Sequence, residues 1–164
     1  MPITPFHFGP AALVHAIAPR QVSFLAFCTA HVLVDLEPLF YMYTGQYPLH
    51  RFFHTYLGVG LVVLLTLTLF WLALRVRHVR WLPNLFYWKS LSALPIVLGS
   101  LIGAYFHVFL DSFMHADIRP FAPFSSENGL YRILSAYDLE WFCMAAGVIG
   151  VLVLLLRRVL ARFD

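Results

Sequence analysis

The stretch that decides the fold is residues 57–74, which read LGVGLVVLLTLTLFWLAL. It runs for 18 residues without a charged side chain. A helix that spans a bilayer needs about 20 mostly apolar residues, so this stretch and a few residues before it are long enough to cross. Three other segments have a similar length and character. The sequence therefore predicts four transmembrane helices, over about 21–43, 51–74, 90–113 and 140–156.

The composition of the whole chain excludes most soluble folds. Of the 164 residues, 61% are hydrophobic and 12% are charged, whereas charged residues make up about a quarter of a typical globular chain. No basic patch is interleaved with aromatic residues, so nucleic acid is not an expected partner. We expect one all-α integral membrane domain over residues 1–164, surrounded by membrane lipids and able to form an oligomer.

A shorter apolar segment, residues 10–18, precedes the first predicted span. It begins at Pro10 and is followed by Pro19, and proline is common at both kinds of helix boundary. A helix of this length rises only about 14 Å, which is too short to cross the membrane. We therefore expect an N-terminal half-helix that enters the membrane or packs against the bundle.

The basic residues predict the orientation of the chain, because cytoplasmic loops carry an excess of Lys and Arg. Eight of the 11 Lys and Arg residues fall before the first span, between the second and third, or after the fourth: Arg20, Arg75, Arg77, Arg80, Lys89, Arg157, Arg158 and Arg162. The other three are Arg51, Arg119 and Arg132. We expect a bacterial-type inner-membrane protein with a cytoplasmic C-terminus and an outer loop over about 114–139.

Ionisable side chains inside the predicted spans are the strongest sign of function. Asp35, Glu37 and Asp111 lie in or near the membrane, where each unpaired carboxylate costs about 2.5–3.5 kcal/mol. These three carboxylates, together with His54 and His107, lie toward the outer ends of the predicted spans. All five side chains are therefore expected at a similar depth in the membrane. A bound divalent metal would compensate several carboxylates together.

The spacing of these residues also predicts a metal site. Asp35 and Asp111 each follow a histidine by four residues, so each shares a helix face with that histidine. The expected ligands are Asp35, Glu37, His50, His54, His107 and Asp111. Imidazole and carboxylate groups suit zinc, with manganese or iron next, and the ligands suffice for two ions. The alternatives are a buried polar network and, for His31 and His115, helix packing.

The order of these residues resembles the YdjM-like family of membrane-bound predicted metal-dependent hydrolases. The family's early histidine corresponds to His7, its PDxDH motif to residues 34–38, its HRGxTHS motif to residues 50–55 and its HLxxD motif to residues 107–111. The chain departs from the family where Glu37 replaces the second aspartate, and where the second histidine of the HR motif comes one residue early. The resemblance implies that His7 completes the ligand set. It also implies phosphoester hydrolysis, through the family's proposed kinship with zinc-dependent phospholipase C enzymes.

Together these features predict a membrane-embedded, metal-dependent hydrolase that acts on a phosphoester of a lipid or lipid-linked substrate at the outer membrane face. Glu37 would be a bridging ligand or the general base. Arg51 would grip a phosphate with its planar guanidinium. Two other functions are kept open. One is a structural or assembly protein with a buried polar or metal-stabilised core, and the other is a haem-binding electron carrier that uses histidine pairs.

Overall fold

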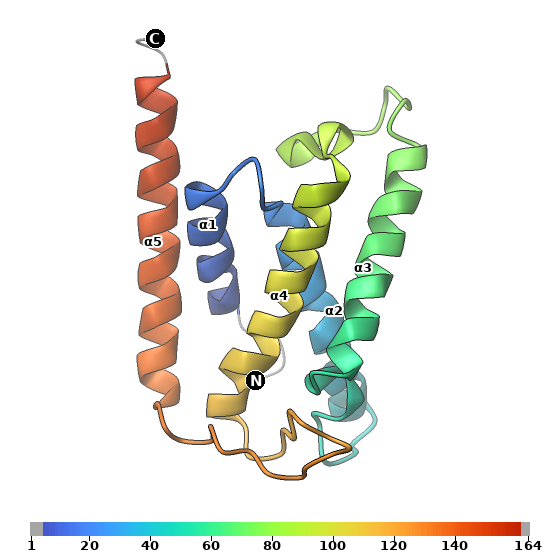
Figure 1. The fold of residues 1–164 in the computed structure, drawn as a ribbon, viewed down its shortest axis with the longest axis vertical. Coiled ribbons are helices and arrows are strands. Elements are labelled where there is room, and N and C mark those ends of the chain that lie inside the picture. The colour runs from blue at the N-terminus through green and yellow to red at the C-terminus, as the bar shows by residue number, and fades with distance from the viewer. Residues whose placement is uncertain (1–4, 162–164) are drawn as a thin grey trace.

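The computed structural model describes residues 5–161, which form a bundle of helices (Figure 1). The four long helices, α2 to α5, are Phe24–Tyr43, Gly58–Arg75, Ala93–Met114 and Ala136–Leu160. A shorter helix, α1, is Phe8–Ile17, and three 3-10 turns, η1 to η3, are Pro5–His7, Phe52–His54 and Leu85–Ser90. The long helices have the length and hydropathy of membrane spans. The predicted all-α fold with four spans and an N-terminal half-helix is therefore confirmed.

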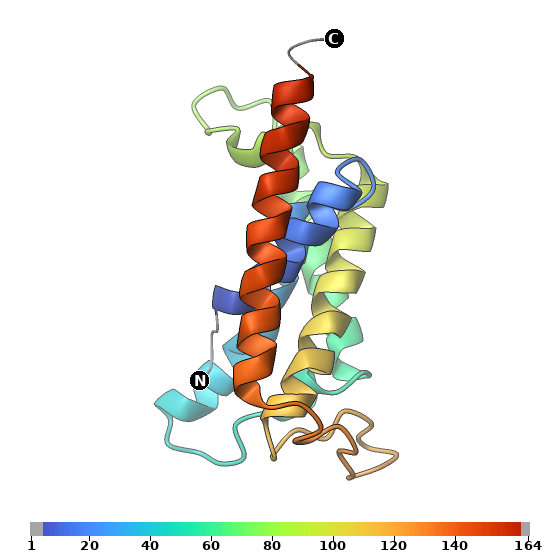
Figure 2. The same cartoon turned by 90° about the vertical axis from the view of Figure 1, so that its left-hand side faces the viewer.

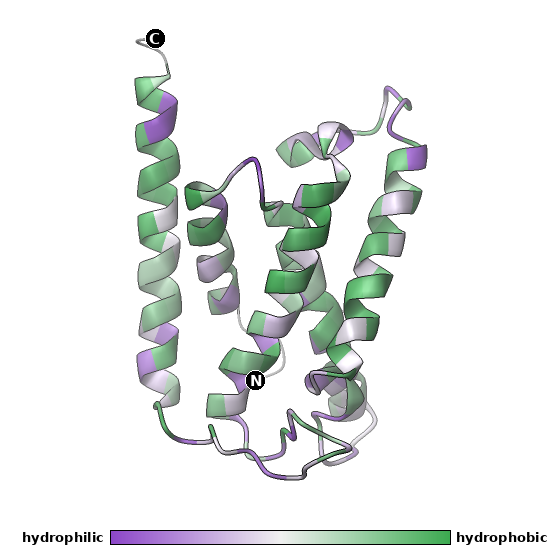
Figure 3. Cartoon of the chain, viewed as in Figure 1, coloured by the Kyte–Doolittle hydropathy of each residue, from purple (hydrophilic) through white to green (hydrophobic). Residues whose placement is uncertain are grey.

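The long helices run roughly parallel to one axis, and their connections gather at its two ends (Figures 1 and 2). Residues 44–57 and 115–135 lie at one end, and residues 76–92 lie at the other, as the predicted sides require. Figure 3 shows that most of the length of the long helices is apolar. On α5, for example, Val148 is 61% exposed and Leu152 is 59% exposed. Such apolar surfaces are suited to contact with lipid, and the chain is an integral membrane protein.

The predicted spans differ from the observed helices by a few residues, most at the starts of the second and fourth spans, and the fourth also continues past 156 to Leu160. The second helix begins at Gly58 rather than near Arg51, because the Glu37 carboxylate accepts the backbone N–H groups of Arg51 and Phe53 and holds this segment as η2. The fourth helix begins at Ala136 rather than Glu140, because the Ser135 hydroxyl caps it by accepting the Asp138 N–H. Arg162, assigned above to the cytoplasmic side, lies outside the described residues.

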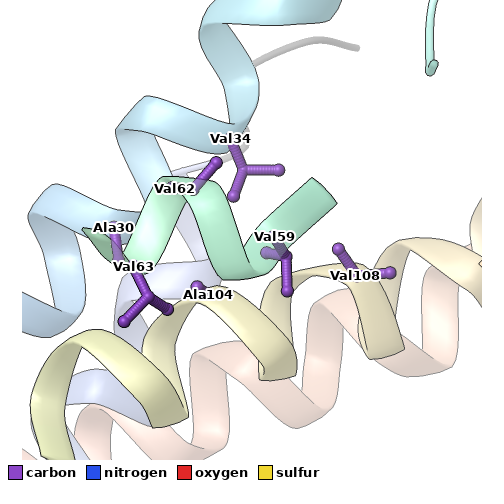
Figure 4. Close-up of a cluster of buried hydrophobic side chains, with 7 residues drawn as sticks. All are labelled: Ala30, Val34, Val59, Val62, Val63, Ala104 and Val108. Atoms are coloured by element: carbon purple, nitrogen blue, oxygen red, sulfur yellow. The ribbon is translucent and has the colours of Figure 1, made fainter. Parts of the chain in front are cut away.

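Helices α2, α3 and α4 pack through small and β-branched residues. Their buried cluster, shown in Figure 4, consists of Ala30, Val34, Val59, Val62, Val63, Ala104 and Val108. Close approach of α2 and α4 depends on Gly103, since a Cβ atom there would lie 2.6 Å from the Phe27 carbonyl oxygen. Small residues at helix contacts are typical of membrane proteins, where close backbone packing replaces the hydrophobic effect. This packing sets the separation of the helices that carry the ionisable side chains.

The half-helix α1 lies against α5 and does not cross the bundle (Figures 1 and 2). Its contact with α5 is as close as backbones allow: a Cβ atom on Gly150 would lie 2.6 Å from the Ala12 carbonyl carbon. Gly9 likewise has no room for a side chain beside the Cys143 carbonyl. His7, the residue before this helix, is buried at 4% exposure, and its ring lies next to those of His31 and His107.

Candidate metal centre

Six buried ionisable residues meet between the helices, toward the end that carries loops 44–57 and 115–135. They come from η1, α2, η2 and α4, and are His7, His31, Asp35, His54, His107 and Asp111. Each is at most 7% exposed. Charged and polar groups buried this deeply need close partners of opposite character. The arrangement of their donor and acceptor atoms therefore decides what this cluster can bind.

The centre of the cluster is formed by Asp35, His54, His107 and Asp111. Each offers a nitrogen or oxygen atom within 4.8 Å of the atoms offered by the other three. His107 Nε2 lies 3.4 Å from Asp35 Oδ1 and 3.3 Å from Asp111 Oδ2, and His54 Nε2 lies 3.7 Å from Asp111 Oδ2. These separations exceed the usual hydrogen-bond length but match those between ligands of one ion. Imidazole nitrogens and carboxylate oxygens are usual ligands of divalent transition metals, so this group could hold a metal ion.

Three histidines of the site use Nδ1 to contact a second residue. The Nδ1 contacts are His54 to Glu37 Oε2 at 3.4 Å, His50 to Asp117 Oδ1 at 2.8 Å, and His107 to His31 Nδ1 at 2.7 Å. A histidine that binds a metal through Nε2 usually donates its Nδ1–H group in this way, which fixes the tautomer and the ring orientation. Because the Nδ1 atoms of His50, His54 and His107 are already in contact with other residues, Nε2 is the atom of each ring that is free to bind a metal.

Glu37, predicted as a ligand or general base, lies beside the centre rather than in it. Its Oε2 atom accepts the backbone N–H groups of Arg51 and Phe53, both at 3.0 Å, and contacts His54 Nδ1. It belongs to none of the groups of ligand atoms within 4.8 Å of one another. In this geometry Glu37 positions η2 and orients the His54 ring.

Arg51, the predicted phosphate-binding residue, packs on the end of α2 and on its own loop. Its guanidinium carbon lies 3.6 Å from the Tyr41 ring centroid, and its Nε donates to the Pro48 carbonyl oxygen. It also lines a cavity of about 510 Å³ at this end of the bundle. The lining residues are Pro48, His50, Arg51, Phe52, Thr55, Leu57, Asp117, Arg119, Ala122 and Pro123. Arg51 therefore faces the cavity next to the centre.

Two further groups of ligand atoms adjoin the central four. One consists of His50, Asp111 and His115, and the other of His7, His31 and His107. His7, implied by the family resemblance, approaches with its Nε2 atom 3.5 Å from Asp111 Oδ1. All seven predicted metal ligands thus lie in or beside one cluster, with Glu37 as an orienting residue.

Sequence reasoning assigned no site role to His31, His115 or Asp117, which the structure places in or next to these groups. His115 continues the four-residue spacing of His107 and Asp111, and this spacing was the available signal. Burial lowers the pKa of His115 to about 4, so its ring is neutral and has a lone pair near neutral pH. Burial alone would raise the pKa of Asp117, but hydrogen bonds from His50 lower it below its usual value.

Several buried polar atoms of the cluster make no hydrogen bond within the described part of the chain. They are His7 Nδ1, His31 Nε2, His54 Nε2, His107 Nε2 and Asp111 Oδ1. Nearly all buried polar atoms in proteins make a hydrogen bond, so five that lack one in a single cluster require an explanation. A divalent ion fits, because it would bind the Nε2 atoms and carboxylate oxygens that have no partner. The residues present are therefore suited to hold a metal.

Comparison with known proteins adds no relative: no family model, curated protein or solved structure matches this chain. The resemblance to the YdjM-like family therefore remains a prediction from its motifs.

Proposed function

We propose that the chain is a membrane-embedded, metal-dependent hydrolase that cleaves a phosphoester of a lipid or lipid-linked substrate. The observation that carries this proposal is the buried group of Asp35, His54, His107 and Asp111, with its unbonded Nε2 and carboxylate atoms. A divalent metal in such a site lowers the pKa of a coordinated water toward about 7 and so supplies a nucleophile at neutral pH. Zinc suits these ligands best, and manganese or iron suit them next.

The residues around the ligands support a site that is rigid enough for catalysis. Glu37 fixes the ring of His54, and His31 contacts His107 at the same ring position. Partners of this kind typically change metal affinity or activity by about 10–100-fold when they are removed. A site that positions its ligands in advance favours a reactive metal centre.

The cavity beside the centre supports an anionic lipid as the substrate. It places Arg51 and Arg119 among apolar side chains such as Phe52 and Leu57. Arginine binds phosphate through two parallel hydrogen bonds, and apolar walls suit the part of a lipid next to its head group. Its position at the end of the bundle fits a substrate held at the membrane–water boundary. Because most cations lie at the other end, we assign this end to the outer face.

The second candidate is a structural membrane protein with a buried polar core. The short contact between His31 and His107, and the continuity of the cluster across α2, α4 and the turns η1 and η2, favour it. The haem alternative is less compatible with the geometry. In six neighbouring pairs of histidine rings the centroids lie 4.3–5.8 Å apart, which leaves no room for a porphyrin plane between the two rings of any of these pairs.

Metal content and turnover of an Asp111→Asn variant test the hydrolase proposal against the structural one. We expect the purified wild type to contain zinc, manganese or iron and to hydrolyse a lipid phosphoester, and the variant to lose both. Glu127→Gln, which neutralises an exposed carboxylate in the outer loop, is the control and should retain both. Metal without turnover on any lipid phosphoester would favour a metal-stabilised structural core. Turnover that survives in Asp111→Asn would overturn the proposal.

A further inference from the structure

A second potential metal site lies against the central one. His50, Asp111 and His115 offer ligand atoms within 4.8 Å of one another, and Asp111 belongs to both groups. The rings of His50 and His115 lie 4.3 Å apart between centroids. The three residues come from the loop before η2, from α4 and from the position after α4. Three separate segments of the chain therefore place potential metal-ligand atoms close together.

Each of these donors is available for binding. The Nδ1 atom of His50 is occupied by Asp117, which also accepts the backbone N–H groups of Leu49 and His50. This arrangement fixes the ring and leaves Nε2 as the ligand atom. Asp111 is 4% exposed, and its Oδ1 atom makes no hydrogen bond to the described residues. A buried carboxylate oxygen without a hydrogen bond requires an explanation, and a bound cation supplies one.

We propose that the chain binds two divalent ions, with Asp111 bridging them, and that His50 and His115 complete the second site. This inference rests on the proposed function and adds a second ion to it. Enzymes that transfer or hydrolyse phosphate esters often hold two ions about 3.5–4 Å apart, which together bind the attacking and leaving oxygens. Asp111 is the shared ligand that such a pair requires.

The outer cavity indicates the role of the second site. His50 and Asp117 line this cavity, whereas none of the four residues of the central site does. The second site is therefore nearer the space in which a substrate would bind. Arg51 and Arg119 line the same cavity and supply positive charge next to it. The second site would thus contact the phosphate group of the substrate, between the central site and the two arginines.

Manganese binding to the full-length protein in detergent tests this inference. The protein is stripped with a chelator and titrated with Mn²⁺, the bound metal is counted, and the electron paramagnetic resonance spectrum is recorded. We expect two Mn²⁺ per chain and the spectrum of an exchange-coupled pair in the wild type. His115→Gln should bind one Mn²⁺ and give the six-line spectrum of an isolated ion. His50→Gln, which reaches the site from another segment, should do the same.

The matched control is His78→Gln, which changes an exposed histidine at the opposite end of the bundle. It should keep two ions and the coupled spectrum. Binding of one ion by the wild type, or of two coupled ions by both His115→Gln and His50→Gln, would overturn the inference. Helicity and elution volume of each variant show whether the fold is retained.

The same preparation separates this inference from the proposed function. Two coupled ions without hydrolysis of any lipid phosphoester would support the second site and contradict the hydrolase. Hydrolysis with one ion, unaffected by His115→Gln, would support the hydrolase and contradict the second site.

Discussion

Glu37 is the residue whose role differs most from its expected one. Its carboxylate, expected at the metal, instead accepts two backbone N–H groups and contacts the His54 ring. Asp35, two residues earlier on α2, contributes to the centre directly. The difference arises because residues two apart on a helix point in different directions, so only one can face the ligands on α4.

Glu37→Gln separates an orienting role from a catalytic one. Since the geometry gives Glu37 an orienting role, we expect metal affinity to fall by about 10–100-fold, as when other such partners are removed. Metal titration and the pH profile of turnover measure the effect. Unchanged metal affinity with a lost acidic limb in the pH profile, the limb in which activity rises with pH, would instead identify Glu37 as the general base. Glu127→Gln serves again as the control.

Arg119 tests the role of the outer cavity in substrate binding. Its exposed side chain lines the cavity, and a hydrogen bond to a charged group contributes about 1.5–3 kcal/mol, less when exposed. We expect Arg119→Ala to raise KM for an anionic lipid by about tenfold, with little change in kcat or metal content. Arg80→Ala, at the opposite end of the bundle, is the control. An unchanged KM would remove Arg119 from the substrate site.

The residues of the central group were largely predictable from the sequence, because ionisable residues within predicted apolar spans are costly and indicate a functional site. Asp35, His54, His107 and Asp111 are such residues, and all four meet. Asp117 was not predictable. Asp117 lies in a long loop that brings it next to His50. Loops have no regular side-chain spacing, so the sequence does not predict which residues they contact.

At the scale of helices, the sequence predicted each long element but not each boundary. Hydropathy identifies a span because lipid demands about 20 apolar residues. Residues 51–57 are largely uncharged and directly precede the apolar run 57–74, so hydropathy predicts that they join the helix. They instead form η2 and a turn. The reason is that the Arg51 and Phe53 N–H groups donate hydrogen bonds to the Glu37 carboxylate. A hydropathy profile cannot predict such tertiary contacts.

Gly103 tests whether helix separation controls the centre. A Cβ atom there would lie 2.6 Å from the carbonyl oxygen and 2.9 Å from the Cα atom of Phe27, and backbone atoms cannot move aside easily. We expect Gly103→Ala to destabilise the protein by about 1–3 kcal/mol, the usual cost of overpacking. It should also weaken metal binding, because His107 follows one turn later. Thermal unfolding in detergent and metal titration measure both effects.

Gly60→Ala is the matched control on α3. A Cβ atom at Gly60 would meet only the Tyr105 hydroxyl oxygen, at 3.8 Å, which is ordinary contact. Its stability should equal or slightly exceed that of the wild type, since alanine favours the helix. Equal unfolding temperatures for Gly103→Ala and the wild type would show that α2 and α4 can separate at no cost.

At the scale of the whole molecule, the distribution of charge predicts the orientation in the membrane. We expect Ser126→Cys, in the exposed outer loop, to react with a membrane-impermeant maleimide on intact cells. His78→Cys, at the other end, should react only after the membrane is permeabilised. The native Cys143 is buried and Cys28 lies inside α2, so both should remain unlabelled. The reverse labelling pattern would place the cavity in the cytoplasm.

The half-helix α1 has a consequence for how the protein is made. It is too short to cross the bilayer, and it leans on α5, whose Arg157 guanidinium donates to the Ile17 carbonyl oxygen across 140 residues of chain. During synthesis, α1 leaves the ribosome long before the helix that holds it in place. His7 can therefore reach Asp111 only when nearly the whole chain has been translated and inserted. An interrupted chain would contain most residues of the cluster but could not hold His7 in its place beside Asp111.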